Sequence, residues 1–202
     1  MQSESKGNIR QQMRRRRRQL SGQAQRLAAS ALCNRLFEGP LRRRFQCIAG
    51  YFPVDGEISI LPVLSRLMWQ GKSVYLPVLP PRVTDRELAF YGYYRDSNLV
   101  SNRWGIPEPL DGPICPVRAL DVVLLPLTAF DPAGRRIGMG GGYYDCTFAF
   151  RRYRNQWRRP YLVGIAHEVQ KIPHIEQAHW DVPVDCIVTD RAIYPVTADT
   201  KL

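Results

Sequence analysis

The residues best suited to chemistry form one run, Asp131-Pro-Ala-Gly-Arg-Arg-Ile-Gly-Met-Gly-Gly-Gly-Tyr-Tyr-Asp145. It holds five of the chain's 15 glycines. Backbone N–H groups in such a loop can close on a phosphate, above all where a helix begins directly after it. A strand-like apolar run over residues 121–126 precedes the loop, and a helix-compatible run over residues 143–150 follows it. The arrangement fits a phosphate-binding loop, although the same glycines would also serve plain tight turns.

The charged residues of the loop suit phosphoryl transfer. The run is not a Walker loop, because it lacks G-x-x-x-x-G-K-[ST], and Tyr143 stands where G-x-G-x-x-G needs its third glycine. It offers free amides, Arg135 and Arg136 beside them, and Asp145 at the start of the helix. Phosphoryl transfer depends mainly on positioning and on charge neutralisation by amides, cations and Mg²⁺ held by one or two carboxylates. We therefore predict a protein that binds a phosphate-bearing ligand with Mg²⁺.

Strands alternating with helices must position this loop. Strands are expected at residues 47–52, 73–78, 88–94, 121–126, 161–166 and 186–189. An amphipathic helix over residues 60–67 ends at Gly71. This alternation predicts an α/β fold: a Rossmann-like, mostly parallel sheet flanked by helices. At 202 residues and 45% hydrophobic composition, residues 1–202 are expected to form a single domain.

The N-terminal part is basic and helical. Residues 1–44 hold 12 Lys and Arg against two acids, whereas the remainder holds 17 against 16, so the net charge of +11 belongs almost entirely to this part. Helices are expected over residues 8–20 and 21–37, with Ser21 as the N-cap of the second. Residues 1–38 should pack on the body as a helical hairpin. The residues expected to face inward are Ile9, Met13, Arg17 and Leu20, then Ala24, Leu27, Ala28, Ala31, Leu32 and Leu36.

Five consecutive arginines, Arg14 to Arg18, have three interpretations. They form a solvated helix face whose stems pack on the body, a non-specific nucleic-acid surface, or an anion site in which a few of them reach a substrate phosphate. Lys6 and Arg10 lie four residues apart, hence on one helix face, and that pair could clamp an anion.

Four further residues stand out by their position. Glu57 follows a turn at residues 53–56 after the first strand, and open α/β sheets bind ligands at the carboxyl edge of their strands. The alternative is a glutamate in the first turn of a helix, where the helix dipole favours it. Trp104 lies in a Pro/Gly loop, either as a packing plug or as a stacking surface for a flat ligand. Asp181 and Asp185 fall in a turn near the end of the chain.

Composition excludes several classes. No apolar run approaches the ~20 residues of a membrane span, and no apolar segment follows the N-terminal charges, so no secretory signal is expected. The five cysteines are scattered, odd in number and without a C-x-x-C pair. That argues against a disulfide framework and structural zinc, and fits a reducing cytoplasm.

Residues 126–145 closely resemble the signature of the 5-formyltetrahydrofolate cyclo-ligase (methenyltetrahydrofolate synthetase) family. Other landmarks of that family match in order: the Lys6-x-x-x-Arg10 pair, a strand, turn and glutamate from Phe52 to Glu57, the Gly71-Lys-Ser-Val-Tyr-Leu-Pro77 strand, Trp-Gly-Ile-Pro-Glu-Pro from Trp104, and Trp180-Asp-Val-Pro-Val-Asp185. The resemblance runs from about residue 6 to about residue 190, nearly the whole chain.

The resemblance implies ATP- and Mg²⁺-dependent closure of 5-formyltetrahydrofolate to 5,10-methenyltetrahydrofolate, through a phosphorylated formyl (iminium phosphate) intermediate, with release of ADP and phosphate. It implies catalytic roles for Arg136, Tyr143 and Asp145, and Mg²⁺ ligands at Asp145 and Asp181. The implied ATP-binding residues are Lys6, Arg10, Arg136, Ile137, Gly138, Met139, Gly140, Gly141, Gly142, Tyr143 and Tyr144. The implied folate-binding residues are Phe52, Glu57, Trp104, Met139, Gly140, Gly141, Gly142 and Tyr143.

The chain departs from the family pattern in places. Some members carry Lys or Arg within the glycine run, where this chain has Met139 and Gly141, and many bacterial members have Arg where this chain has Cys146. The expected partners are small molecules, namely ATP and 5-formyltetrahydrofolate with or without a polyglutamate tail. The protein is expected to be a cytoplasmic monomer that binds neither a membrane nor nucleic acid. The alternatives are a non-specific RNA-binding α/β protein using the arginine-rich helix, and sugar-phosphate or acyl-CoA chemistry on a similar fold.

Overall fold

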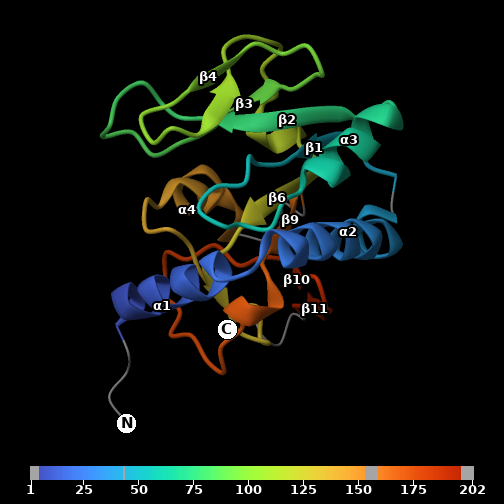
Figure 1. Ribbon diagram of the computed structural model, residues 1–202. Helices are drawn as coiled ribbons and strands as arrows, with labels where there is room; N and C mark the ends of the chain where they lie inside the picture. The colour runs from blue at the N-terminus through green and yellow to red at the C-terminus, as the bar shows by residue number, and fades with distance from the viewer. Residues whose placement is uncertain (1–4, 43, 153–158, 197–202) are drawn as a thin grey trace.

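The centre of the fold is a mixed sheet whose inner strands are all parallel (Figure 1). The computed structural model describes residues 5–42, 44–152 and 159–196. Within them, the main sheet has seven strands in the order β11-β10-β9-β6-β1-β2-β3. The parallel strands are β1 (Cys47–Ala49), β2 (Ser73–Val78), β6 (Val122–Pro126), β9 (Tyr161–Ile165) and β10 (Cys186–Val188). The edges, β3 (Ala89–Gly92) and β11 (Ile193–Pro195), are antiparallel. The prediction of an α/β fold with a mostly parallel sheet is confirmed.

Strand β6 shows why this sheet forms. It pairs with β1 on one side and β9 on the other. Val122 and Leu124 pack into the core on one face, whereas Val123 and Leu125 pack into the core on the opposite face. A strand buried on both faces requires this nearly continuous apolar run. Its carboxyl end, Pro126, therefore has a fixed position at the sheet edge.

Helices cover both faces of the sheet. One face carries α2 (Gly22–Glu38) and α3 (Leu61–Trp69), which share a core with the inner strands. The other carries η2 (Val117–Ala119), α4 (Tyr143–Thr147) and η3 (Ala149–Arg152). The remaining short helices are η1 (Pro40–Arg42) and η4 (Glu168–Gln170). No helix in the described ranges is long and apolar enough to cross a membrane.

The predicted start of α2 is confirmed, whereas part of its predicted buried face is wrong. The Ser21 hydroxyl oxygen accepts a hydrogen bond from the Ala24 amide, so Ser21 is the N-cap. Leu27, expected to face inward, is 64% exposed. The buried stripe instead runs through Ala28, Ala29, Leu32, Cys33 and Leu36, because the helix is rotated by about one residue relative to the expected face.

Two short hairpins replace segments expected to be loops. Strand β7 (Ala129–Phe130) pairs with β8 (Arg136–Ile137), so the glycine run leaves from a hairpin and not directly from the central strand. Strand β4 (Leu99–Ser101) pairs with β5 (Pro107–Pro109). Strands of two or three residues are too short for an alternating pattern to be readable.

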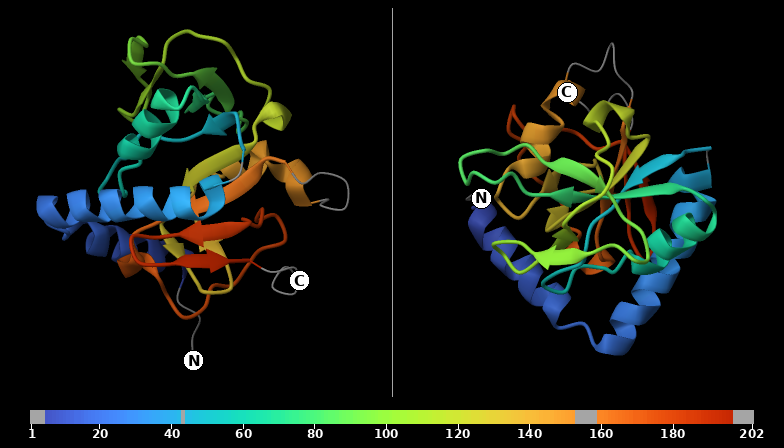
Figure 2. Two further views of the ribbon diagram at one scale, coloured as in Figure 1. Left: turned by 90° about the vertical axis from the view of Figure 1, so that its right-hand side faces the viewer. Right: turned by 90° about the horizontal axis from the view of Figure 1, so that it is seen from above.

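Helix α1 (Lys6–Arg18) forms a V-shaped hairpin with α2 (Figure 2, right). Its Met13 side chain is fully buried against Ala129, Ile137 and Ile175. Burial of a methionine side chain stabilises a fold by roughly 1.5–3 kcal/mol. Because Ala129 and Ile137 belong to the β7–β8 hairpin, this contact holds α1 beside the glycine run.

Candidate active site

A cavity of about 1020 Å³ lies at the carboxyl edge of the parallel strands. Its wall includes Phe52 beyond β1, Pro126 at the end of β6, and the glycine run. Each of the site residues implied by the sequence lines this one cavity: Lys6, Arg10, Phe52, Glu57, Trp104, Arg136, Ile137, Gly138, Met139, Gly140, Gly141, Gly142, Tyr143, Tyr144, Asp145 and Asp181. They come from α1, the β1–α3 segment, the β4–β5 hairpin, the glycine run and the segment before β10. The fold therefore brings them together in space.

One face of α1 presents a row of cations to the cavity. Lys6, Arg10, Arg14 and Arg18 are spaced four residues apart and all line it. The Lys6 ammonium lies 3.3 Å from Asp181 Oδ2, and Arg10 Nε donates to the Gly138 carbonyl at 2.9 Å. Arg10 is thus held on the glycine run and Lys6 on the Asp181 carboxylate, and both line the cavity.

Three of the five arginines from Arg14 to Arg18 bind one aspartate, and the other two face solvent. Arg14, Arg17 and Arg18 all bind the carboxylate of Asp55, whereas Arg15 and Arg16 are exposed. Although burial opposes it, hydrogen bonds from the three arginines hold the pKa of Asp55 below its ordinary value. The packing of the N-terminal helix on the body therefore uses the arginines themselves.

The glycine run owes its shape to missing side chains. Gly140 and Gly142 have φ of +102° and +71°, a region that side chains other than glycine rarely adopt. A Cβ on Gly141 would lie 2.8 Å from the Tyr143 ring. Any side chain at position 141 would therefore have to displace Tyr143, which explains physically why this chain has glycine there. Cys146, which also departs from the family pattern, is exposed on the cavity wall.

Two carboxylates, Asp145 and Asp181, line the cavity on segments that a hydrogen bond joins. Asp145 Oδ1 accepts hydrogen bonds from Arg136 Nη2 at 2.6 Å and from the Val182 amide at 3.0 Å. Asp181, the residue before Val182, accepts through Oδ2 from the Ala178 amide at 2.8 Å. Because Asp181 directly precedes Val182, this hydrogen bond holds the segment that carries Asp181 against Asp145.

The donor set fits Mg²⁺ shared with a phosphate ligand. Carboxylate oxygens are hard ligands, and Mg²⁺ is commonly held by one or two of them while waters and substrate phosphates complete its octahedron. No cluster of three or more His, Cys, Asp or Glu suitable for a metal occurs among the described residues. Asp145 and Asp181 therefore suit a metal that arrives with a nucleotide, not one held in a protein cage.

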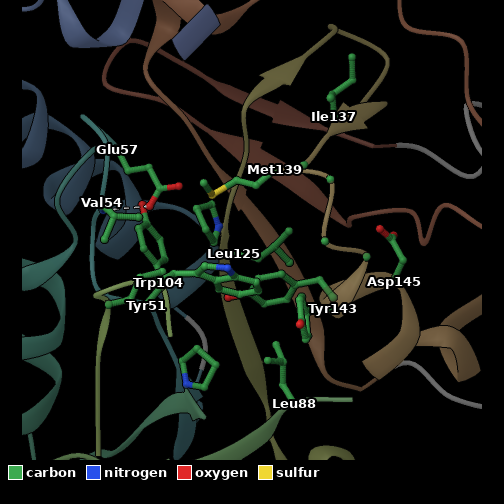
Figure 3. A pocket seen from close by; sticks show the side chains of 18 of the residues that line it. Tyr51, Val54, Glu57, Leu88, Trp104, Leu125, Ile137, Met139, Tyr143 and Asp145 are labelled. Carbon is green, nitrogen blue, oxygen red and sulfur yellow. Dashed lines mark hydrogen bonds between the residues drawn. The ribbon is translucent and has the colours of Figure 1, made fainter. Parts of the chain in front are cut away.

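Glu57 supplies a buried carboxylate on the other side of the cavity. Figure 3 shows Glu57 and Asp145 on opposite sides, with Met139 between them. Glu57 Oε2 accepts from the Val54 amide at 3.2 Å, and the residue is 6% exposed. Burial raises the pKa of Glu57 to about 7, against the attraction of Arg17. Glu57 precedes α3 by several residues, so it is a loop residue and not one in the first helical turn.

An aromatic pair forms the rim beside Glu57. The rings of Trp104 and Tyr143 meet edge to face, with centroids 5.3 Å apart. Figure 3 shows both residues in the wall of the cavity. Trp104 is 54% exposed, so it is not a packing plug, and its exposed surface is available for stacking on a flat ligand. The Tyr143 hydroxyl accepts from Arg103 at 3.1 Å and from Arg86 at 3.4 Å.

The sequence did not identify four residues that contact the site residues: Asp55, Arg86, Arg103, and Arg17, which is the buried partner of Glu57. Arg103 had one signal, its place beside Trp104 in the Pro/Gly loop. Arg86 had none, since it belongs to an irregular segment between β2 and β3.

The fold and the cavity define an α/β protein that carries the parts of a phosphate site at the carboxyl edge of a parallel sheet: a glycine run, a cation row and adjacent carboxylates. A model of the 5-formyltetrahydrofolate cyclo-ligase family matches residues 2–190. The chain therefore belongs to this family.

Individual relatives agree with the family match. The chain is 36% identical over 185 residues to the 5-formyltetrahydrofolate cyclo-ligase of Escherichia coli (strain K12), covering 90% of this chain and 98% of that protein. It is 36% identical over 186 residues to the Haemophilus influenzae cyclo-ligase, covering 91% and 97%. The NMR structure of Aquifex aeolicus 5,10-methenyltetrahydrofolate synthetase superposes with a TM-score of 0.79 at 26% identity, covering 95% of this chain and 92% of that one.

Two arginines of α1 should differ sharply in effect. Arg10→Ala removes the guanidinium that binds the Gly138 carbonyl and faces the cavity. We expect it to raise the KM for ATP roughly 10-fold or more, as loss of a charged hydrogen bond does. Arg16→Ala should be nearly silent, because that side chain faces solvent. Steady-state ADP release at varied ATP measures both; equal effects of the two variants would refute the assignment of Arg10.

Proposed function

We propose that this protein catalyses the ATP- and Mg²⁺-dependent cyclisation of 5-formyltetrahydrofolate to 5,10-methenyltetrahydrofolate, with release of ADP and phosphate. The observation that carries the proposal is that one cavity joins a glycine run and α1 cations to a buried carboxylate and an aromatic rim. The first set suits a triphosphate, and the second suits a flat heterocycle with N–H donors. The curated relatives bear the name of this activity.

In this proposal ATP lies between α1 and the glycine run. Lys6, Arg10 and Arg136 neutralise phosphate oxygens, and the amides from Ile137 to Tyr144 bind them without adding bulk. Asp145 and Asp181 would hold Mg²⁺, which supplies charge neutralisation at the phosphates when bound. Asp145 also orients Arg136 through their 2.6 Å hydrogen bond.

The folate lies across the rest of the cavity. Glu57 accepts hydrogen bonds from N–H groups of the pterin, while Phe52 and Trp104 contact its faces. Met139 to Tyr143 contact both substrates, because that stretch lies between Glu57 and Asp145 (Figure 3). This places the formyl group next to the terminal phosphate.

The reaction then follows from the positions of the two substrates. The formyl oxygen attacks the γ-phosphorus as the bond to ADP breaks, and Arg136 stabilises the charge that develops on the transferred group. The formyl carbon, now bearing phosphate as a leaving group, is attacked by the second folate nitrogen. Phosphate leaves with the former formyl oxygen and takes up the proton that the attacking nitrogen loses, and the methenyl bridge is complete. Tyr143, held by Arg86 and Arg103, closes the wall at this point.

We also propose that the enzyme works in the cytoplasm as a monomer, on folates with or without a polyglutamate tail. The state of the cysteines fits a reducing compartment, since all five are free thiols.

The direct test is an activity assay. Protein, ATP, Mg²⁺ and 5-formyltetrahydrofolate are mixed, and the near-ultraviolet absorbance of the methenyl product is followed, with ADP measured in parallel. We expect product and ADP to appear in equal amounts, and neither to appear when ATP or the folate is omitted. An absorbance rise that does not need ATP, or no rise at all, would refute the proposal.

A further inference from the structure

Arg17 is a guanidinium with no access to solvent, on the helix that carries the cation row. Its side chain is 0% exposed. A buried charge costs folding free energy unless other charges and hydrogen bonds compensate it. Arg17 Nε donates to the Asp55 carbonyl at 2.8 Å, and Nη2 donates to Asp55 Oδ2 at 3.0 Å. Two of its nitrogens are thus used to fix the Asp55 turn.

The third nitrogen faces Glu57. Arg17 Nη1 lies 3.6 Å from Glu57 Oε1, an ion pair that is too long for a hydrogen bond. Both of these atoms are buried and have no hydrogen-bond partner. Glu57 Oε2 is already held by the Val54 amide. The carboxylate is therefore anchored on one side and keeps a free acceptor, Oε1, in a residue that lines the cavity.

We propose that Arg17 is a positioning residue for folate recognition: it orients Glu57 and favours its charged form, so that the carboxylate accepts the N–H groups of the pterin. The inference rests on the proposed function and extends it to a residue that does not itself line the cavity.

The charges around Glu57 support this role. Arg17 and Arg14 face it from α1, Asp55 from its own turn, and Tyr144 from α4, with Tyr51 beyond β1 also nearby. Burial is the strongest influence and raises the pKa of Glu57, and Arg17 is the strongest influence that opposes it. Without Arg17, burial would act with less opposition, so less of Glu57 would be ionised near neutral pH.

The backbone of Arg17 and the turn share a hydrogen-bond donor on α2. The side-chain nitrogen Nε2 of Gln25 donates to the Arg17 carbonyl at 3.2 Å and to the Gly56 carbonyl at 3.4 Å. Gly56 has φ of +76°, and a Cβ there would lie 3.3 Å from the Arg17 carbonyl oxygen. The helix that carries Lys6 and Arg10 and the turn that leads to Glu57 therefore pack as one unit.

The test compares Arg17→Met and Arg17→Lys with Arg16→Met as the exposed control. ADP release gives the KM for each substrate between about pH 6 and about pH 9. We expect Arg17→Met to raise the folate KM roughly fivefold near pH 7 and roughly 10-fold near pH 6, as a rise of about one in the pKa of Glu57 would do. The KM for ATP should stay within about twofold, and the folate defect should shrink as pH rises. Arg17→Lys should restore part of the affinity, and Arg16→Met should match the wild type.

A double-mutant cycle makes the outcome decisive. If Arg17 acts through the charge of Glu57, Arg17→Met should add no further folate defect in a Glu57→Gln background. An undiminished penalty there, or an equal rise in both KM values, would overturn the inference. If Arg17→Met fails to fold in a thermal unfolding control, Arg17→Lys carries the same cycle. An active wild type with an unchanged Arg17→Met refutes the inference alone, whereas an inactive wild type refutes it together with the proposed function.

Discussion

Replacing Asp145 with alanine should lower kcat by roughly 100-fold or more while the protein remains folded. Asp145 accepts hydrogen bonds from Arg136 at 2.6 Å and from the Val182 amide, so it fixes Arg136, the cation that faces the transferred phosphate in the proposed reaction. In the proposed reaction it also holds Mg²⁺. Its loss would remove two contributions to charge neutralisation at once. ADP release under saturating substrates measures the effect.

Two companion variants separate charge from architecture. Asp145→Asn keeps an oxygen for the Val182 amide but has no charge, so it should be nearly as inactive as Asp145→Ala. Asp85→Ala removes an exposed carboxylate whose side chain bonds only to Thr84 among the described contacts, and should retain full activity. Thermal unfolding of all three checks the fold. Turnover at the wild-type rate in Asp145→Ala would rule out the metal and orienting roles.

Replacing Glu57 with glutamine should raise the KM for 5-formyltetrahydrofolate roughly 10-fold or more and leave the KM for ATP nearly unchanged. A neutral amide cannot accept two pterin N–H groups as a carboxylate does, and charged hydrogen bonds are about twice as strong as neutral ones. The side chain lies on the opposite side of the cavity from Asp145 (Figure 3), which confines the defect to one substrate. Substrate titrations followed by ADP release measure both constants.

The same carboxylate should give the wild type a pH dependence. Burial raises the pKa of Glu57 to about 7, so the ionised form increases as pH rises through that value. Folate binding should therefore strengthen from about pH 6 to about pH 8, whereas Glu57→Gln should show no such change. A wild-type folate KM that is flat over this range, or one that rises with pH, would contradict the assignment of Glu57.

The central architecture could be predicted from the sequence because its signals are local. The apolar run of β6 and the Ser21 cap both depend on neighbouring residues, and both lie where they were expected. The hairpins β4–β5 and β7–β8 could not be predicted, since such short strands carry no periodic pattern. The rotation of α2 that exposes Leu27 depends on which helix face meets the sheet, and that is a tertiary property.

The candidate site, too, could be predicted from the sequence only in part. The glycine run and the landmarks around it could be named from their order along the chain, and the fold gathers all of them at one cavity. The contacts of Arg17 with Asp55 and Glu57 could not be predicted, because they join residues about 40 positions apart. The helical pattern placed Arg17 on the inward side of α1, and its burial confirms this, but the pattern carried no information about the carboxylates that it meets there.

The central claim is that the glycine run brings the formyl oxygen of the folate into contact with the γ-phosphate of ATP. Its most direct test uses 5-formyltetrahydrofolate labelled with ¹⁸O in the formyl group, with the released phosphate analysed by mass spectrometry. Attack of that oxygen on phosphorus predicts one ¹⁸O atom in each phosphate formed. Unlabelled phosphate, with the label released into water, would contradict the claim, because it would mean that ATP is hydrolysed without direct transfer to the folate.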